Sequence, residues 1–169
     1  MIYIVLKLKI KRSWNEMKWN PKDIEKYKGA KEYVDTVILP LNGITFESGM
    51  IQSASMNEFI SILTQEIENQ FKGRVLLLPQ LTYCADWDSG LLRDTISRWH
   101  ETLTMQDFKH VFYITADEEW KKVDVIPGNS LIWTASLPLE HMEDKYKKPL
   151  IEEQVQEIMQ KIIRLWRRG

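Results

Sequence analysis

Carboxylates recur in the polar segments that follow the apolar runs of this 169-residue chain. One such segment carries Glu47, the next carries Asp86 and Asp88, and a third carries Asp117. If these side chains converge, their oxygen atoms suit a hard cation such as Mg²⁺. Carboxylates in exposed loops also stabilise helix N-termini, where the helix dipole favours negative charge. This structural use is the commoner one, because clustered charges mark functional sites only in a fraction of cases.

Cys84 is the only cysteine, and it lies in the second of these segments beside Tyr83. A cysteine nucleophile needs a neighbouring base and a depressed pKa. The histidines are poorly placed for this: His100 falls on the polar face of an expected helix, His110 at the start of a strand, and His141 in a charged loop. The residue types therefore indicate no catalytic group, and a structural cysteine is the simpler interpretation. A single cysteine also excludes an intrachain disulfide framework and a thiolate zinc finger.

Alternating helices and short apolar strands must position these segments. Asn20 and Pro21 are typical of a helix start, and Ser55 with Glu58 matches a capping box. Pro149 is expected to begin the last helix. The expected strands are residues 36–39, ending at Pro40, 74–78, ending at Pro79, 111–114, 123–126 and 131–135, and the expected helices include residues 21–32, 59–71, 92–103 and 149–166. Asn42-Gly43 and Pro127-Gly128-Asn129 are expected to be turns.

This alternation predicts an α/β fold, with three αβα layers around a mostly parallel sheet of about four to five strands. Ligands of such sheets bind outside the carboxyl ends of the strands. We therefore expect a candidate ligand-binding edge made of loop residues, with Trp87 and Trp120 nearby as possible anchors or core residues. Its members are Glu47, Tyr83, Cys84, Asp86, Asp88, Asp117 and Asn129. We expect no metal and no cofactor, since the chain has no GxGxxG, P-loop, GxSxG or HExxH motif.

Residues 1–16 form a candidate N-terminal extension, and residues 17–169 are expected to form a single α/β domain. Ile2–Ile10 ends in alternating apolar and basic residues, which indicates a strand. Met17 then opens the stretch MKWNPKDIEKY, which is typical of a natural protein start. Two interpretations stay open: an upstream start that is not used, or an edge strand whose lysines discourage edge-to-edge pairing.

The composition of the chain limits the classes of partner that we expect. A net charge of −1 argues against a general nucleic-acid binder, which carries a basic excess. No apolar run approaches the ~18–20 residues of a membrane span. The expected partner is a protein or a small ligand, and a homo-oligomer is possible on these grounds.

The stretch MKWNPKDIEKYKGAKEYVDTVILPL, together with LLLPQLTY and the tryptophan-rich end, resembles the YpiF-like family of Bacillus-type bacteria. The resemblance covers nearly all of the chain from Met17 onward. It implies a cytoplasmic protein of a Gram-positive bacterium and a family of unknown function.

A remoter resemblance is to the creatininase family of metal-dependent amidohydrolases. Leu39-Pro40-Leu41 with the segment 43–49 is similar to that family's first motif, and Leu78–Tyr83 is similar to the second. Departures fall on the metal ligands, because Phe46 stands where the family has Glu and Ser48 where it has His. Thr115-Ala116-Asp117 replaces an Asn-Gly-His segment. The resemblance thus implies the fold without its metal chemistry, which needs three or more ligands in fixed geometry.

The sequence thus predicts a non-catalytic binding or accessory protein on a degenerate creatininase-like scaffold. Two alternatives stay open at this point. The first is a divergent metal-dependent amidohydrolase that uses Glu47, Asp86, Asp88 and Asp117. The second is a homodimeric structural protein.

Overall fold

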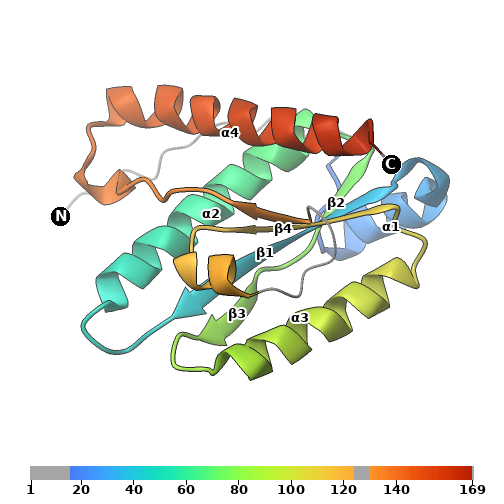
Figure 1. Cartoon of the computed structure of the whole chain (residues 1–169). Helices are drawn as coiled ribbons and strands as arrows, with labels where there is room; N and C mark the ends of the chain where they lie inside the picture. The colour runs from blue at the N-terminus through green and yellow to red at the C-terminus, as the bar shows by residue number, and fades with distance from the viewer. Residues whose placement is uncertain (1–15, 124–129, 169) are drawn as a thin grey trace.

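Five strands form one parallel sheet in the computed structural model, which describes residues 16–123 and 130–168. The central strand β1 pairs with β4 on one side and with β2 and then β3 on the other, and β5 pairs with β4. Their bounds are β1 (Thr36–Ile44), β2 (Val75–Leu77), β3 (Leu81–Cys84), β4 (His110–Thr115) and β5 (Leu131–Trp133). Because every pair is parallel, the carboxyl ends of the strands lie at one edge of the sheet (Figure 1).

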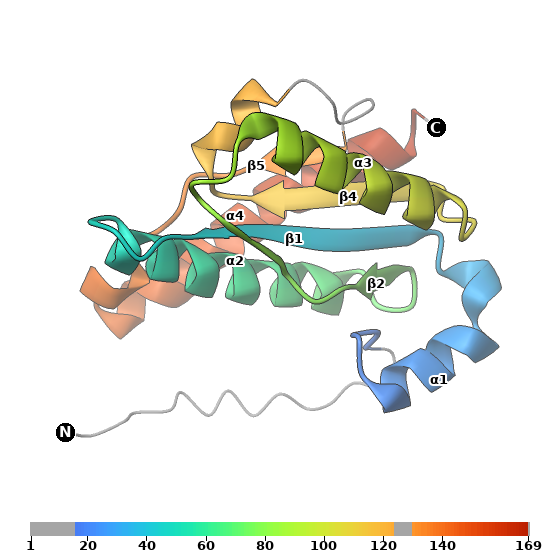
Figure 2. The ribbon, with the colours of Figure 1, turned by 90° about the horizontal axis from the view of Figure 1, so that it is seen from below.

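Helices cover both faces of this sheet, so the predicted three-layer α/β architecture is confirmed (Figures 1 and 2). α2 (Met50–Gln70) and α4 (Asp144–Trp166) lie on one face, and α3 (Ser89–Thr104) lies on the other. α1 (Pro21–Gly29) adds Ile24 and Tyr27 to the edge of the α3-side core. Asn20 caps α1 as expected, since its side chain accepts a hydrogen bond from the Asp23 N–H.

Successive residues of β1 enter two separate hydrophobic cores. Leu39 and Leu41 point into the α3-side core, whereas Ile38 points into the core beneath α2 and α4. The predicted stripe of α2 faces that second core, where Leu63 and Ile67 are fully buried. Each such side chain contributes roughly 1.5–3 kcal/mol by leaving water. Strands buried on both faces explain the near-continuous apolar runs in the sequence.

β1 does not end at Pro40 but continues to Ile44, so the expected Asn42-Gly43 turn is wrong. The Leu78 N–H donates to the Ile38 carbonyl at 3.0 Å, on the side of β1 that faces β2. Pro40 faces the same side two residues later and has no N–H. The segment of the chain that pairs with β1 is interrupted at this point: β2 ends at Leu77, and β3 pairs with β1 from Leu81 onward. The expected loop after Pro79 therefore contains a strand.

Two helix starts also differ from the prediction. α2 begins at Met50, and Ser55 lies inside it, where its hydroxyl donates to Glu140 at 2.7 Å instead of capping the helix. α4 begins at Asp144, so Pro149 lies within the helix. Asp144 suits the first turn of α4 because a negative charge there complements the helix dipole.

Some expectations fall outside the described residues. These are the strand at Ile2–Ile10 and the segment 124–129, which holds most of one expected strand and Asn129. Of the helices that the structure describes, none combines the length and apolar character that crossing a bilayer requires.

Candidate functional site

The candidate residues that the structure describes do lie at the carboxyl edge of the sheet, but they do not form one cluster. Tyr83 and Asp117 are in direct contact, and Asp88 stands apart at the start of α3. Glu47 and Asp86 are exposed on loops. Across residues 16–123 and 130–168, no three His, Cys, Asp or Glu side chains are grouped so that they could hold a metal ion.

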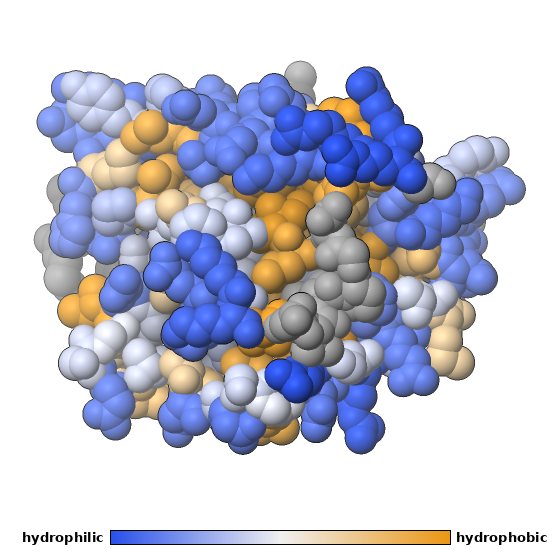
Figure 3. Space-filling model, viewed as in Figure 1, coloured by the Kyte–Doolittle hydropathy of each residue, from blue (hydrophilic) through white to orange (hydrophobic). Residues whose placement is uncertain are grey.

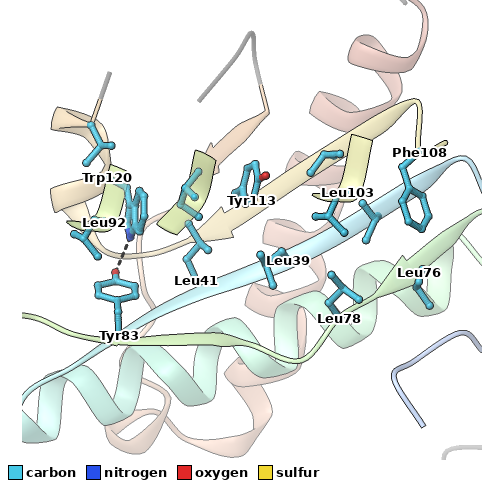
Figure 4. Packing of buried hydrophobic residues seen from close by; sticks show 14 of the residues in the cluster. Leu39, Leu41, Leu76, Leu78, Tyr83, Leu92, Leu103, Phe108, Tyr113 and Trp120 are labelled. Carbon is cyan, nitrogen blue, oxygen red and sulfur yellow. Dashed lines mark hydrogen bonds between the residues drawn. The ribbon is translucent and has the colours of Figure 1, made fainter. Parts of the chain in front are cut away.

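Tyr83, Asp117 and Trp120 form a hydrogen-bonded cluster near the end of β1. Figure 4 shows the Tyr83 and Trp120 side chains and the hydrogen bond between them. The Tyr83 hydroxyl donates to Asp117 Oδ2, and the Trp120 Nε1–H donates to the Tyr83 hydroxyl at 2.6 Å. The two rings meet edge to face, with centroids 5.5 Å apart. These hydrogen bonds satisfy the polar atoms of two buried aromatic side chains. We therefore interpret the cluster as structural: it links the segment after β4 to β3.

Gly43 is the residue that lets this cluster approach β1. A Cβ atom at position 43 would lie 2.9 Å from Tyr83 Cε2 and 3.0 Å from Asp117 Oδ2. Only a glycine leaves space for both groups at their observed positions. Asn42-Gly43 was predicted to form a turn, but Gly43 lies within β1 and packs closely against a tyrosine ring.

Helix capping accounts for two of the candidate carboxylates. Asp88 Oδ1 accepts the N–H groups of Gly90 and Leu91 at 2.8 and 3.1 Å, which caps α3. Asp117 Oδ1 accepts the Glu119 N–H at 3.0 Å at the start of the short 3₁₀ turn Glu118–Lys122. Both carboxylates therefore satisfy N–H groups that a helix start leaves free.

We predict that Asp88→Ala lowers the free energy of unfolding by about 1 kcal/mol, because the first turn of α3 loses its cap. The melting temperature should fall by about 2–4 °C. Asp86→Ala is the matched control, since Asp86 is exposed two residues earlier, and it should change stability by less than ~0.5 kcal/mol. Thermal unfolding followed by circular dichroism checks both, and equal losses at the two positions would refute the capping role.

Cys84 is half-buried. Each of the three histidines has a different structural position, and none is recorded in contact with Cys84 among the described residues. His100 Nδ1 lies 3.1 Å from the Tyr113 hydroxyl beneath α3, so this histidine is not on a fully polar face as expected. Burial lowers the pKa of His100. His110 begins β4 at the opposite edge of the sheet, as the sequence predicted, and His141 lies beside Glu140. These placements support a structural interpretation of Cys84.

Tyr83 and Tyr113 should stay neutral until the protein unfolds at high pH. Burial raises the pKa of Tyr83, and the bond to Asp117 raises it further; burial alone raises the pKa of Tyr113. Unfolded phenols ionise near pH ~10, so stability falls as pH rises above that value. Phenolate absorbance should show these two groups ionising together with unfolding, and Tyr83→Phe should remove one of them. Their ionisation in a protein that is still folded would contradict the burial argument.

Apart from Trp87, which was considered as a possible anchor, the sequence-based candidates missed the exposed apolar residues at this same edge. We define the loop-edge surface as Phe46, Met50, Ile51, Trp87 and Leu91 with the carboxylates Glu47, Asp86 and Asp88. Phe46 and Ile51 are each 77% exposed. The two loops leave the sheet side by side, because the Ala85 N–H donates to the Ile44 carbonyl at 2.8 Å. A signal was present: aromatic and aliphatic residues occur close to acidic ones in the loop sequences TFESGMI and ADWDSGL.

Two surface hollows lie away from this edge. One, of about 290 Å³, lies between β5 and the end of α4 and is lined by Trp133, Leu165 and Arg168 among others. Figure 3 shows apolar surface below the hydrophilic α4 in that region. The other, of about 310 Å³, lies beside Pro40 and Pro79 at the break between β2 and β3. Neither is lined by a residue of the loop-edge surface.

Comparison with known proteins places the chain in a family. A relative described as the uncharacterized protein YpiF of Bacillus subtilis (strain 168) is 35% identical over 150 residues, which make up 89% of this chain and 98% of the relative. No solved structure matches the chain, so the creatininase resemblance stays a prediction. A family model described as protein of unknown function (DUF2487) matches residues 25–166. Both matches agree with the YpiF-like resemblance, and the chain belongs to this DUF2487 family.

Proposed function

We propose that this protein is a non-catalytic binding protein whose partner is another protein that docks on the loop-edge surface. One observation carries the proposal: large apolar side chains are exposed on two adjacent loops and on the helix starts that follow them, at the edge of the sheet where α/β proteins bind ligands. Exposed apolar residues gathered at one place, unlike scattered ones, mark interaction sites. The surface lies on loops and helix starts and lines neither of the two hollows described above, which favours a macromolecule over a small ligand.

Aromatic side chains would supply most of the affinity. Phe46 and Trp87 are of the types that dominate binding energy at protein interfaces. Burying a side chain such as Phe46 or Ile51 is worth roughly 1.5–3 kcal/mol. Loops on a rigid sheet can hold such side chains ready for contact, which reduces the entropy lost on binding.

Charge indicates the chemistry of the partner. The loops 45–49 and 85–90 carry Glu47, Asp86 and Asp88 and contain no lysine or arginine. A partner segment that combines apolar residues with Lys or Arg would match both features of the surface. Its association should slow as salt is added, since exposed charges steer encounter through long-range attraction. We further propose that this binding takes place in the cytoplasm, as the resemblance to YpiF-like proteins implies.

The hydrogen bonds that two of the loop carboxylates already make support the non-catalytic part of the proposal. Asp88 caps α3, and Asp117 is held by Tyr83 and by the Glu119 N–H. A metal-dependent hydrolase built on the loop acids would need these oxygen atoms to converge on one cation. Their separate structural uses make that alternative the weaker one.

Photo-cross-linking in living cells tests the proposal. We would replace Phe46 with a photoreactive phenylalanine analogue and, in a control chain, replace Met105, which is 74% exposed just after α3 at the opposite end of that helix. We expect a discrete cross-linked species from position 46 that position 105 does not give. Identical products from the two positions, or only cross-links between copies of this chain, would contradict the proposal.

Charge reversal refines this test. Glu47→Lys together with Asp86→Lys should weaken the position-46 cross-link at least several-fold, because both changes oppose a basic partner. Reversal of Glu157, an exposed residue of α4, to lysine is the control and should leave it unchanged. Mass spectrometry of the cross-linked peptide then identifies whether Lys and Arg flank the contact.

A further inference from the structure

Glu68 is a fully buried carboxylate whose hydrogen bonding is incomplete. It lies near the end of α2 with 0% of its surface exposed. Its Oε1 accepts the backbone N–H of Met17 at 2.7 Å, and among the residues that the structure describes its buried Oε2 has no hydrogen-bond partner. Buried carboxylates are normally paired with a cation or fully hydrogen-bonded, because an isolated buried charge is very unfavourable. One amide N–H is too little for this group.

The nitrogen of Met17 is held firmly in front of this carboxylate. The Met17 side chain is 5% exposed and packs in the α3-side core. Its carbonyl accepts the Leu77 N–H at 2.9 Å, and Lys18 forms a parallel bridge with Leu77 at the edge of the sheet. Side chain and carbonyl together fix the direction of the nitrogen, which points at Glu68.

We propose that Glu68 is the buried counter-ion of the α-ammonium group of a mature chain that begins at Met17. An α-ammonium group brings a positive charge and three N–H donors to the position where an amide brings one. It could therefore bond both Glu68 oxygens from where the nitrogen already lies. This inference is independent of the proposed function.

Three further observations agree with this assignment. Burial raises the pKa of Glu68, and the hydrogen bond from Met17 and the charge of Lys18 lower it without offsetting the burial, so the carboxylate is incompletely compensated. The stretch MKWNPKDIEKY has the character of a protein start. The YpiF relative aligns over 98% of its own length with 89% of this chain, so the relative is the shorter protein.

Intact mass spectrometry is the first test. The untagged protein, produced from its gene under the gene's own start signals, should have the mass of a chain beginning at Met17. A mass that corresponds to Met1 would overturn the proposal. Met17→Leu in the same gene should remove the product, since translation would lose its start.

Glu68→Gln in that untagged protein tests the ion pair itself. If Glu68 balances an ammonium ion, the neutral amide should lower the melting temperature by roughly 10 °C, because one charge of a buried pair is left alone. Glu66→Gln, two residues earlier on α2, should change it by no more than ~2 °C. If Glu68 is instead a neutral acid bonded to an amide, glutamine should be tolerated, and an unchanged melting temperature would overturn the proposal.

The pH dependence separates an ion pair from ordinary packing. Glu68 would raise the pKa of the α-ammonium group above its usual ~7.7–8.0, so its stabilisation is complete below that range and is lost as pH rises through the raised value. The difference in melting temperature between wild type and Glu68→Gln should therefore shrink between pH 7 and about pH 10. Lys18 and Asp23 face the same carboxylate but are present in both proteins. A constant difference would contradict the ammonium assignment.

Discussion

Trp120→Ala should lower the free energy of unfolding by about 3–5 kcal/mol and the melting temperature by roughly 10 °C. Among the residues that the structure describes, Trp120 is the largest fully buried side chain, with 1% of its surface exposed. Its removal leaves a cavity beside Leu92 and Leu41 in the α3-side core and deprives the Tyr83 hydroxyl of a donor (Figure 4). Denaturant unfolding measured by circular dichroism gives the loss directly.

Two variants divide this effect into its parts. Trp120→Phe keeps an aromatic ring but loses the indole N–H, so we expect a smaller loss, about half of that for alanine. Trp87→Ala changes the same residue type at the same edge, where 37% of the side chain is exposed, and should cost less than ~1 kcal/mol. Equal losses for Trp87 and Trp120 would mean that Trp120 is not part of the core.

Gly43→Ala should destabilise the protein by about 1–3 kcal/mol although it adds a single methyl group. The added carbon would lie within 3.0 Å of both the Tyr83 ring and Asp117, so either β1 or the Tyr83–Asp117 pair must shift. The shift should appear in near-ultraviolet circular dichroism, because the Tyr83 and Trp120 rings are in contact.

Gly29→Ala provides the matched control for this substitution. A Cβ atom at Gly29, the last residue of α1, would meet no other atom within 4 Å. Alanine is also the better helix former, so this variant should be neutral or slightly more stable. A loss at position 29 equal to that at position 43 would refute the close approach of Tyr83 to β1.

Periodicity in the sequence was enough to predict the layers of this fold. Runs such as 36–39 and 111–114 are apolar without alternation, which is typical of strands buried on both faces, and both are strands in the structure. The α2 stripe of Phe59, Leu63 and Ile67 is buried as its spacing indicates. These predictions succeeded because burial depends on local patterns that the sequence displays directly.

Predictions of where an element begins or ends were less accurate when they relied on a single residue. Pro40 was expected to end a strand, but β1 continues past it. The missing N–H of Pro40 faces the interruption between β2 and β3 at residues 78–80. Ser55 was expected to cap α2, but it meets Glu140 from a segment 85 residues away in sequence. In each case a contact between distant segments decides the outcome, and such contacts leave no local signal.

The sequence predicted where the candidate residues lie in the fold, but it did not predict their contacts. The carboxyl edge of the sheet holds Tyr83 and Asp117 as expected, yet sequence order could not show that they bond to each other or that Asp88 caps α3. The sequence also could not show that Phe46 and Ile51 are exposed, because an apolar residue is expected in the core unless the fold shows otherwise. Only the fold shows which side chains remain uncovered.

The most direct test of a non-catalytic loop edge is thermal unfolding of the purified protein with Mg²⁺, Mn²⁺ and Zn²⁺ added one at a time. A metal that binds only the folded protein, at 100 times its dissociation constant, would add about 2.7 kcal/mol of stability. Because Asp88 and Asp117 are engaged in helix caps and in the bond to Tyr83, and because the described residues hold no group of three possible metal ligands, we predict an unchanged melting temperature with each metal. A rise that Asp86→Ala or Asp117→Ala abolishes would contradict this and establish a metal site at the loop edge.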